Sequence, residues 1–227
     1  MLNACTTAGL QKNLNAVKAV WSLLVSWSSH STGKTQYMFE NIKAYYKNLV
    51  PSISENDWNE LEERMTVQYV KKGEFFLRKG DVCRHVSFMN KGLMRLFYLE
   101  DGKEICTAFV TENNFISEYS SFLTRTPAAQ NMDALEDSEL INLSYDNMQV
   151  LYQSYPVFQI FGRKIAEYLF IQLSKHNTGL LAHTPEQRYQ FLLQEQPQLI
   201  QRVPQYMIAS FIGITPEHLS RIRSKRQ

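Results

Sequence analysis

The strongest constraint on the fold is a run of short apolar segments between about Met65 and Leu143. Apolar and polar residues alternate within them, and turns such as Lys-Gly, Asn-Lys-Gly and Asp-Gly-Lys separate them. The segments read VQYV, EFFLRKG, HVSFMN, LMRLFYL, ICTAFV and SELINLSY. Short strands separated by glycine turns are typical of an antiparallel barrel, roll or sandwich. We therefore predict an antiparallel β domain, with its clearest hairpin turn at residues 100–103.

Helical patterns lie on both sides of this β region. Residues 38–49 predict one helix, and Ser54 is a typical N-cap for a second. Pro156 opens a long helix through about His176, and we expect a break or hinge at residues 177–179. The apolar stripe of the long helix consists of Phe158, Phe161, Ile165, Leu169 and Leu173. Such a stripe fits either packing on its own domain or a seam between two copies of the chain.

The C-terminal segment has the pattern of a helix-turn-helix. Thr184 caps a preceding helix that begins at Pro185. In the following pair, Ala209 is the small residue where the helices cross, and Gly213 stands at the sharp turn. Thr215 then caps the second helix. The residues that we expect on the buried side are Ile208, Ile212, Ile214, Leu219 and Ile222.

The second helix of this pair carries a polar face. Glu217, His218 and Arg221 lie opposite the buried side, because residues three and four apart share a face. In a major groove, arginine suits guanine and glutamate suits the amino group of cytosine, whereas histidine reaches a base or a phosphate. The expected DNA-binding residues are Thr215, Glu217, His218, Ser220, Arg221, Arg223 and Lys225. Residues 201–227 hold five basic residues and one acidic residue, a net charge of +4, which also fits a helical hairpin with a solvated basic tail.

The order of a β-roll, a long helix and a C-terminal helix-turn-helix resembles the Crp/Fnr family of bacterial transcription regulators. The resemblance implies an α+β fold: a jelly-roll-like antiparallel β-roll sensor domain over residues 38–153, a long dimerisation helix over 154–183, and a small all-α helix-turn-helix domain over 184–227. Residues 1–37 are expected to be a disordered or spurious extension. The resemblance also implies a cytoplasmic homodimer that pairs through the helix of residues 154–180, with double-stranded DNA and RNA polymerase as partners.

The effector site implied by the resemblance departs from the pattern of cyclic-nucleotide binders. These carry Phe-x-Gly-Glu, whose glutamate holds the ribose, and then Arg-Ser or Arg-Thr, whose arginine neutralises the phosphate. Here the first part reads Phe115-Ile116-Ser117-Glu118, and the second falls on Ala128-Ala129. A missing arginine forfeits about 1.5–3 kcal/mol for each charged hydrogen bond. We therefore expect an effector pocket at Glu118 and Arg125, but no cyclic nucleotide as cofactor.

Other classes of protein fit the sequence less well. The five histidines are scattered, and the three cysteines include no Cys-x-x-Cys pair, so we expect no metal or iron–sulfur site. Cys106 is expected to be a core residue of a strand. No nucleophile elbow or glycine-rich phosphate loop occurs, and we expect neither catalytic residues nor an enzyme. The apolar run of residues 19–27 is too short to span a membrane. The remaining alternative is a dimeric ligand-sensing or scaffold module that does not regulate DNA.

Overall fold

The computed structural model describes residues 34–224, with side chains from Phe39 onward. The extension expected before residue 38 lies almost wholly outside these residues, and so does Lys225. Two helices precede the β region. They are α2 (Lys34–Leu49) and α3 (Glu55–Glu62). Ser54 caps α3 as predicted, within a capping box completed by Asp57.

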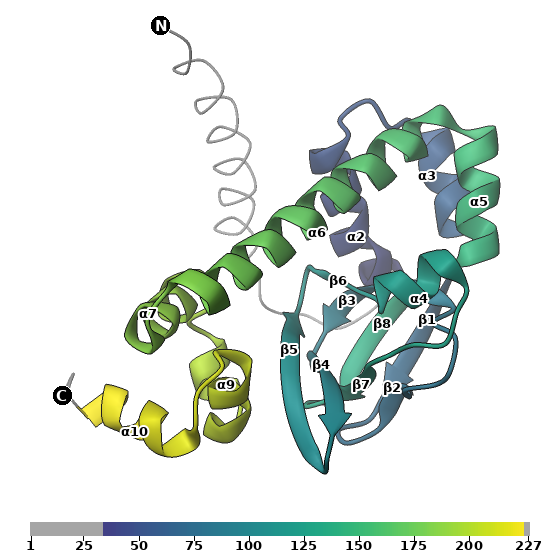
Figure 1. Cartoon of the computed structure of the whole chain (residues 1–227). Coiled ribbons are helices and arrows are strands. Elements are labelled where there is room, and N and C mark those ends of the chain that lie inside the picture. Colours follow the sequence, from purple (N-terminus) through teal and green to yellow (C-terminus); the bar gives the residue numbers. More distant parts are fainter. Residues whose placement is uncertain (1–33, 225–227) are drawn as a thin grey trace, which may run out of the picture. The chain divides into compact units, whose positions relative to one another are not determined.

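The β region forms two packed antiparallel sheets, which confirms the predicted β domain (Figure 1). The strands are β1 (Met65–Val70), β2 (Phe75–Leu77), β3 (His85–Lys91), β4 (Leu93–Glu100), β5 (Lys103–Thr111), β6 (Phe115–Ile116), β7 (Asn131–Ala134) and β8 (Ser138–Ser144). One sheet has the order β1-β8-β3-β6 and the other β2-β7-β4-β5. The turn between β4 and β5 lies where the sequence predicts it. Its two central residues, Asp101 and Gly102, have φ of 50° and 74°, as a tight hairpin requires.

Two short helices that the sequence did not reveal complete this domain. They are α4 (Tyr119–Thr124), between β6 and β7, and α5 (Tyr145–Ser154), directly after β8. The α4 helix has only 6 residues, too few for a helical periodicity to show in the sequence. The short strands β6 and β7 escaped notice for the same reason.

The long helix α6 (Pro156–Ala182) runs without a break (Figure 1). The expected hinge at residues 177–179 is wrong, because the amide of His183 still donates to the carbonyl of Gly179 at 3.1 Å. Glycine inside a helix costs only about 1 kcal/mol relative to alanine, so one glycine does not end a helix by itself. The break falls instead at His183 and Thr184, where a new capping box begins. No helix of residues 34–224 is both long and apolar enough to cross a membrane.

The apolar stripe predicted along α6 divides into two parts. Phe158, Phe161 and Ile165 are buried in the core of the chain's own β-roll domain. The ring of Phe161 stacks on that of Tyr46, with 3.6 Å between centroids. Leu173, by contrast, is 60% exposed. Phe158, Phe161 and Ile165 therefore pack on their own domain. The prediction that they form a seam between two copies is wrong.

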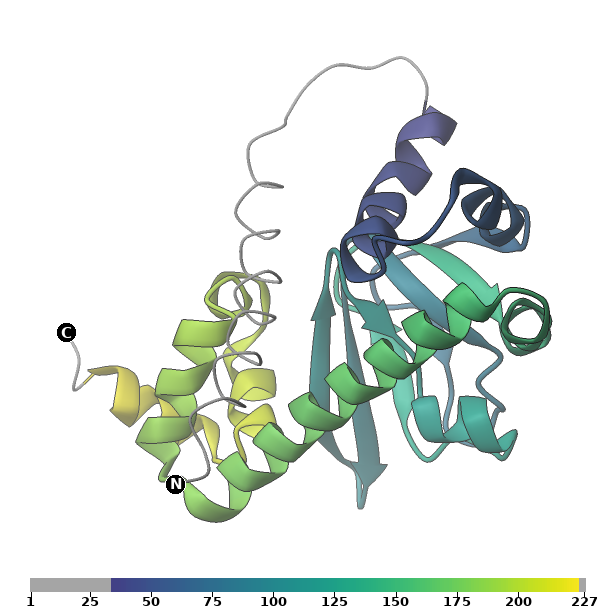
Figure 2. The same cartoon turned by 90° about the horizontal axis from the view of Figure 1, so that it is seen from above.

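Four helices follow α6: α7 (Pro185–Glu195), α8 (Leu199–Arg202), α9 (Gln205–Phe211) and α10 (Pro216–Ser224). Their apolar faces form a second core, which includes Tyr189, Leu192 and Ile208. This core continues onto side chains of β4 and β5. Figure 1 labels α9 beside β5, Figure 2 gives the same region from above, and Phe211 of α9 packs against Phe109 of β5. Cys106 of β5 is 3% exposed, as expected for a core residue of a strand.

Candidate nucleic-acid interface

The crossing of α9 and α10 has the geometry of a helix-turn-helix. Ala209 is completely buried, and its carbonyl accepts a hydrogen bond of 2.9 Å from the amide of Ile214. Gly213 has φ of +70°, a conformation that side chains other than glycine rarely adopt. Leu219 and Ile222 of α10 are 1% and 5% exposed and pack into the second core. The predicted small residue, turn and buried face are all present.

Most of the described residues that were predicted to contact DNA are exposed at the start or on the outer face of α10. Thr215 caps the helix by accepting a hydrogen bond of 3.2 Å from the amide of His218. Of the predicted set, the exposed residues are Thr215, Glu217, Ser220 and Arg221, whereas His218 and Arg223 are half-buried. The Nε2 atom of His218 lies 3.8 Å from a carboxylate oxygen of Glu186 on α7. The exposed residues thus form one polar surface on the outside of α10.

Glu217 is held in its ionised form at the start of α10. Hydrogen bonds from its own backbone amide and from the hydroxyl of Thr215 lower the pKa of its carboxyl. A nearby arginine, Arg221, adds to the effect. An ionised carboxylate is a hydrogen-bond acceptor only, which is the property needed to accept from the amino group of cytosine.

Arg188 is a structural residue of this region that the sequence reading missed. Its Nε donates to the carbonyl of Ile212, at the end of α9, over 2.7 Å. Its Nη1 donates to the carbonyl of His183, just beyond α6, also over 2.7 Å. One guanidinium therefore ties the helix-turn-helix to the end of the long helix. No local pattern in the sequence distinguishes such an arginine from a surface one.

The expected effector residues use their polar groups on the chain itself. Glu118 is 7% exposed and caps α4, with its carboxylate accepting a hydrogen bond of 2.6 Å from the amide of Ser121. The hydroxyl of Ser117 donates to the carbonyl of His85. Arg125 donates to the carbonyl of Cys83 over 2.9 Å, and its guanidinium lies over the ring of Tyr145. Glu118 is therefore a buried helix cap rather than a surface carboxylate.

The position of the missing arginine is part of a backbone ladder. Ala128 is 3% exposed, and its amide donates to the carbonyl of Asp81 over 2.8 Å. Its carbonyl accepts from the amide of Gly80. No side chain at this position offers a charge to a cyclic phosphate.

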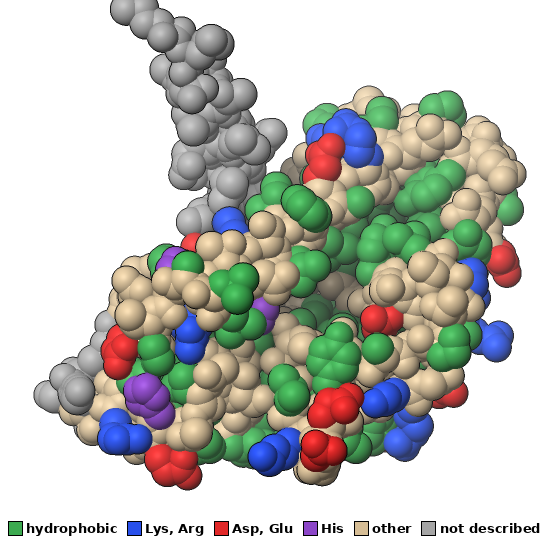
Figure 3. Space-filling view, viewed as in Figure 1, with side chains coloured by type: hydrophobic (Ala, Val, Ile, Leu, Met, Phe, Trp, Pro, Cys, Tyr) green, Lys and Arg blue, Asp and Glu red, His purple; other side chains and the backbone are tan. Residues whose placement is uncertain are grey.

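The cavity that borders this region is apolar. It lies beneath α6, and Figure 3 shows a hollow there with hydrophobic side chains around it. Its lining consists of Tyr46, Leu61, Val86, Phe115, Tyr119, Leu143, Met148, Leu151, Tyr152, Phe158, Phe161, Gly162 and Ile165. Burial raises the pKa of Tyr152 to about 12, so its hydroxyl stays neutral. A cyclic nucleotide does not fit this lining, because nothing in it neutralises a phosphate.

Within residues 34–224, no group of three or more His, Cys, Asp or Glu side chains is arranged to hold a metal ion. His85 is half-buried at the start of β3. Burial and the nearby Arg84 and Arg125 lower the pKa of His85. The half-buried ring therefore stays largely neutral at pH 7.

Comparison with known proteins supports the fold and one domain family. Residues 67–155 match the model of the cyclic nucleotide-binding domain. No curated protein matches the chain. Among solved structures, FixK2 of Bradyrhizobium japonicum is 16% identical with a TM-score of 0.63, covering 71% of this chain and 83% of its own. The c-di-GMP-responsive global regulator CLP of Xanthomonas campestris is 17% identical with a TM-score of 0.59, covering 77% and 92%.

A third structure, from Eubacterium rectale, is described as a regulator of the Crp/Fnr family. It is 16% identical with a TM-score of 0.60, and the match covers 80% of this chain and 87% of that one. At these low identities, the structural similarity shows a common fold alone. The resemblance predicted from the sequence is thereby confirmed: the chain has the fold of Crp/Fnr-type regulators, and its residues 67–155 match the cyclic nucleotide-binding domain family.

Proposed function

We propose that the chain is a DNA-binding transcription regulator of the Crp/Fnr type. The observation that carries this is α10, which buries Leu219 and Ile222 and leaves Glu217, Ser220 and Arg221 exposed. A helix that presents such a face at the surface suits the major groove. The proposed division follows the sequence reading, with a sensor domain over 38–153, a dimerisation helix over 154–183 and a DNA-binding domain over 184–227.

The dimer requires a seam on α6 that the β-roll leaves free. The candidates recur at alternating steps of four and three residues, the heptad spacing of paired helices: Ala166, Phe170, Leu173, Asn177 and Leu180. Phe170, Leu173 and Leu180 are 72%, 60% and 40% exposed. In an ideal helix this row lies about 100° around from the stripe that is buried on the roll. The proposed seam therefore shares only Leu173 with the stripe predicted from the sequence.

The seam has a matched control in the next residue along the helix. Ile171 is 39% exposed but lies on a different face of α6 from Phe170 and Leu173. Replacing Leu173 with glutamate is expected to convert the dimer to a monomer in sedimentation equilibrium, whereas Ile171→Glu leaves it dimeric. Dimerisation that survives both Leu173→Glu and Phe170→Glu contradicts this seam.

In the proposed regulator, two copies place their recognition helices on the half-sites of a palindrome, one helical turn apart. An event in the β-roll shifts the paired helices and alters that spacing. RNA polymerase is the expected partner at the promoter, and the cytoplasm the expected location. Spacing that never responds to any small molecule speaks against this part of the mechanism.

The test is a selection from a random duplex library with the purified full-length chain. The expected product is a two-fold symmetric site, and Leu173→Glu should reduce binding to the full site far more than binding to one half. The competing assignment, a dimeric sensor or scaffold module, predicts that no sequence is enriched over the input library.

A further inference from the structure

The outer face of the β2-β7-β4-β5 sheet is buried although it points away from the interior of the roll. Leu93 and Phe97 of β4 and Phe109 of β5 are between 0% and 7% exposed, and they belong to the core of the C-terminal helices. The ring of Phe109 packs edge-on against that of Phe211 of α9, with 5.3 Å between centroids. The sheet thus supplies part of the hydrophobic core of the DNA-binding domain.

Hydrogen bonds fix α9 on this sheet at one position. The hydroxyl of Ser210 accepts from the amide of Cys106 over 3.0 Å and donates to the carbonyl of Glu104 over 3.0 Å. Because both partners are backbone groups of β5, the contact depends on where α9 lies along the strand. The amide of Cys106 consequently reports whether α9 is docked.

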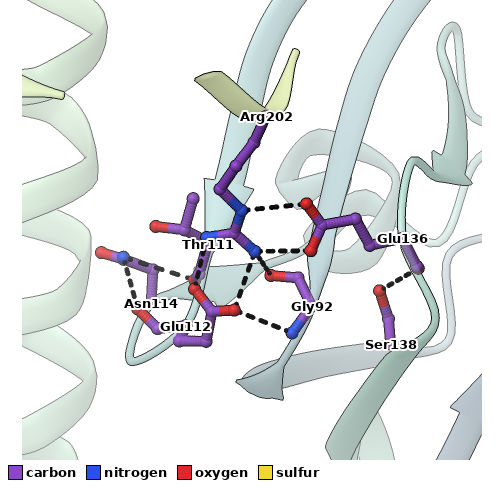
Figure 4. A network of polar contacts seen from close by, with 7 residues as sticks. All are labelled: Gly92, Thr111, Glu112, Asn114, Glu136, Ser138 and Arg202. Atoms are coloured by element: carbon purple, nitrogen blue, oxygen red, sulfur yellow. Dashed lines mark hydrogen bonds and ion pairs between the residues drawn. The ribbon is translucent and has the colours of Figure 1, made fainter. Parts of the chain in front are cut away.

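Arg202 of α8 forms a second set of hydrogen bonds between the C-terminal helices and the β-roll (Figure 4). Its Nε and Nη2 donate to the two carboxylate oxygens of Glu136, over 2.9 Å and 2.7 Å. Its Nη1 and Nη2 donate to the two oxygens of Glu112, over 2.9 Å and 2.8 Å. Nη2 also reaches the carbonyl of Gly92 at 3.1 Å. One guanidinium therefore joins α8 to three separate points of the roll.

The acceptors of Arg202 are themselves held in place (Figure 4). The carboxylate of Glu112 accepts a hydrogen bond of 3.0 Å from the amide of Gly92. Gly92 has φ of +107°, and a Cβ there would lie 2.4 Å from the hydroxyl of Ser138. Burial raises the pKa of the Glu112 carboxyl, but hydrogen bonds from Arg202 and backbone amides outweigh burial and hold the pKa below its usual 4.5. The site is built to receive an arginine.

We propose that Arg202 is a positioning residue for DNA binding: by docking α8 and α9 on the roll, it sets where α10 stands relative to the dimerisation helix. The docked arrangement leaves Glu217, Ser220 and Arg221 exposed, so it presents the recognition helix rather than hiding it. The inference rests on the proposed function. It adds that the spacing between the two recognition helices is set by this contact in the absence of any small molecule.

The first test measures spacing. Duplexes carry two copies of the selected half-site at separations that vary over about one helical turn, about 10 base pairs. We expect Arg202→Gln to lose about tenfold in affinity at the preferred separation and to bind the other separations more evenly. Affinity for a single half-site should stay unchanged, and Arg202→Lys, which keeps the charge, should restore part of the preference. The matched control is Arg64→Gln, which removes a half-buried ion pair with Glu60 on α3.

The second test needs no DNA. Arg202→Gln should speed hydrogen exchange at the Cys106 amide, while amides of β1 and β8 keep their protection. Wild-type spacing preference in Arg202→Gln, or unchanged protection at Cys106, overturns the proposal. Failure of the wild-type chain to bind any duplex counts instead against the proposed function. In that case, hydrogen exchange still decides whether Arg202 holds α8 and α9 on the β-roll.

Discussion

The start of α10 and the segment from Ser117 to Arg125 are the two places where the sequence predicts ligand contacts, and they are built in opposite ways. On α10, Glu217, Ser220 and Arg221 project from the surface, and the helix beneath them is anchored by apolar side chains. In the other segment, Glu118 and Arg125 bond to neighbouring amides and carbonyls. One surface offers polar groups to a partner, whereas the other uses them to hold its own loop.

A residue type that matches a family motif does not keep its role in the family when its partner residue is absent. Glu118 stands at the position of a ribose-binding glutamate, but without an arginine at Ala128 its carboxylate serves as a helix cap. We infer that the roll supports the C-terminal helices and does not bind a cyclic nucleotide through Glu118 and Arg125.

The largest effect is expected on the exposed face of α10. Arg221→Ala should cost about 1–3 kcal/mol of binding free energy and relax specificity at one base pair. Affinities for the selected duplex and for its single-base variants measure this, with Arg163→Ala as the control, since Arg163 is an exposed arginine of α6. An equal loss on every sequence would reassign Arg221 to phosphate contact.

A smaller effect is expected in the segment from Ser117 to Arg125, whose polar groups bond to the chain itself. Arg125→Ala removes the hydrogen bond to Cys83 and the contact with Tyr145, and should lower the free energy of unfolding by about 1 kcal/mol. Arg125 has φ of 59°, and alanine bears the same backbone strain, so the side chain alone is tested. Urea denaturation measures the loss. Affinity for DNA should not change, and a change would mean that this segment communicates with α10.

The contact that docks α8 on the β-roll should depend weakly on pH. The pKa of Glu112 is lowered in the folded chain, so its stabilising effect is fully present above about pH 4.5 and is lost as the pH falls through the lowered value. Because the pair with Arg202 is partly exposed, we expect below about 1 kcal/mol. The difference in melting temperature between wild type and Glu112→Gln should therefore vanish in acid. A difference that persists there would indicate that the charge is not responsible.

The smallest expected effect is none at all. Cyclic AMP should leave the melting temperature unchanged, because Ala128 offers its phosphate no charge and Glu118 and Arg125 already bond to the chain itself. A ligand at 100 times its dissociation constant would add about 2.7 kcal/mol to stability, which a thermal scan detects easily. A clear rise would contradict this expectation.

The sequence predicted the elements whose patterns are local. Glycine turns mark the hairpins, capping residues mark the helix starts at Ser54 and Thr184, and the pair Ala209 and Gly213 marks the crossing. The sequence prediction failed where one continuous apolar pattern covers both a buried and an exposed part of a helix. The stripe from Phe158 to Leu173 reads as continuous, yet its first half is buried on the chain's own roll and Leu173 faces solvent.

The contacts that join the C-terminal helices to the β-roll cannot be predicted from the local sequence. Arg202 meets Glu112 and Glu136 across 90 and 66 positions of sequence, and Ser210 bonds to Glu104 across 106. Nothing near these residues indicates such partners. The sequence analysis did not predict α4, β6 and β7 at all, because each is too short to show a helical or strand periodicity.

Whether α10 binds duplex DNA can be decided by the salt dependence of binding to the selected site. The logarithm of the association constant should fall linearly with the logarithm of salt concentration, with a slope of about −0.9 for each phosphate contacted. Arg221→Ala should also lower affinity at every salt concentration. A purified dimer that shows no affinity for any duplex at low salt would contradict DNA binding by α10.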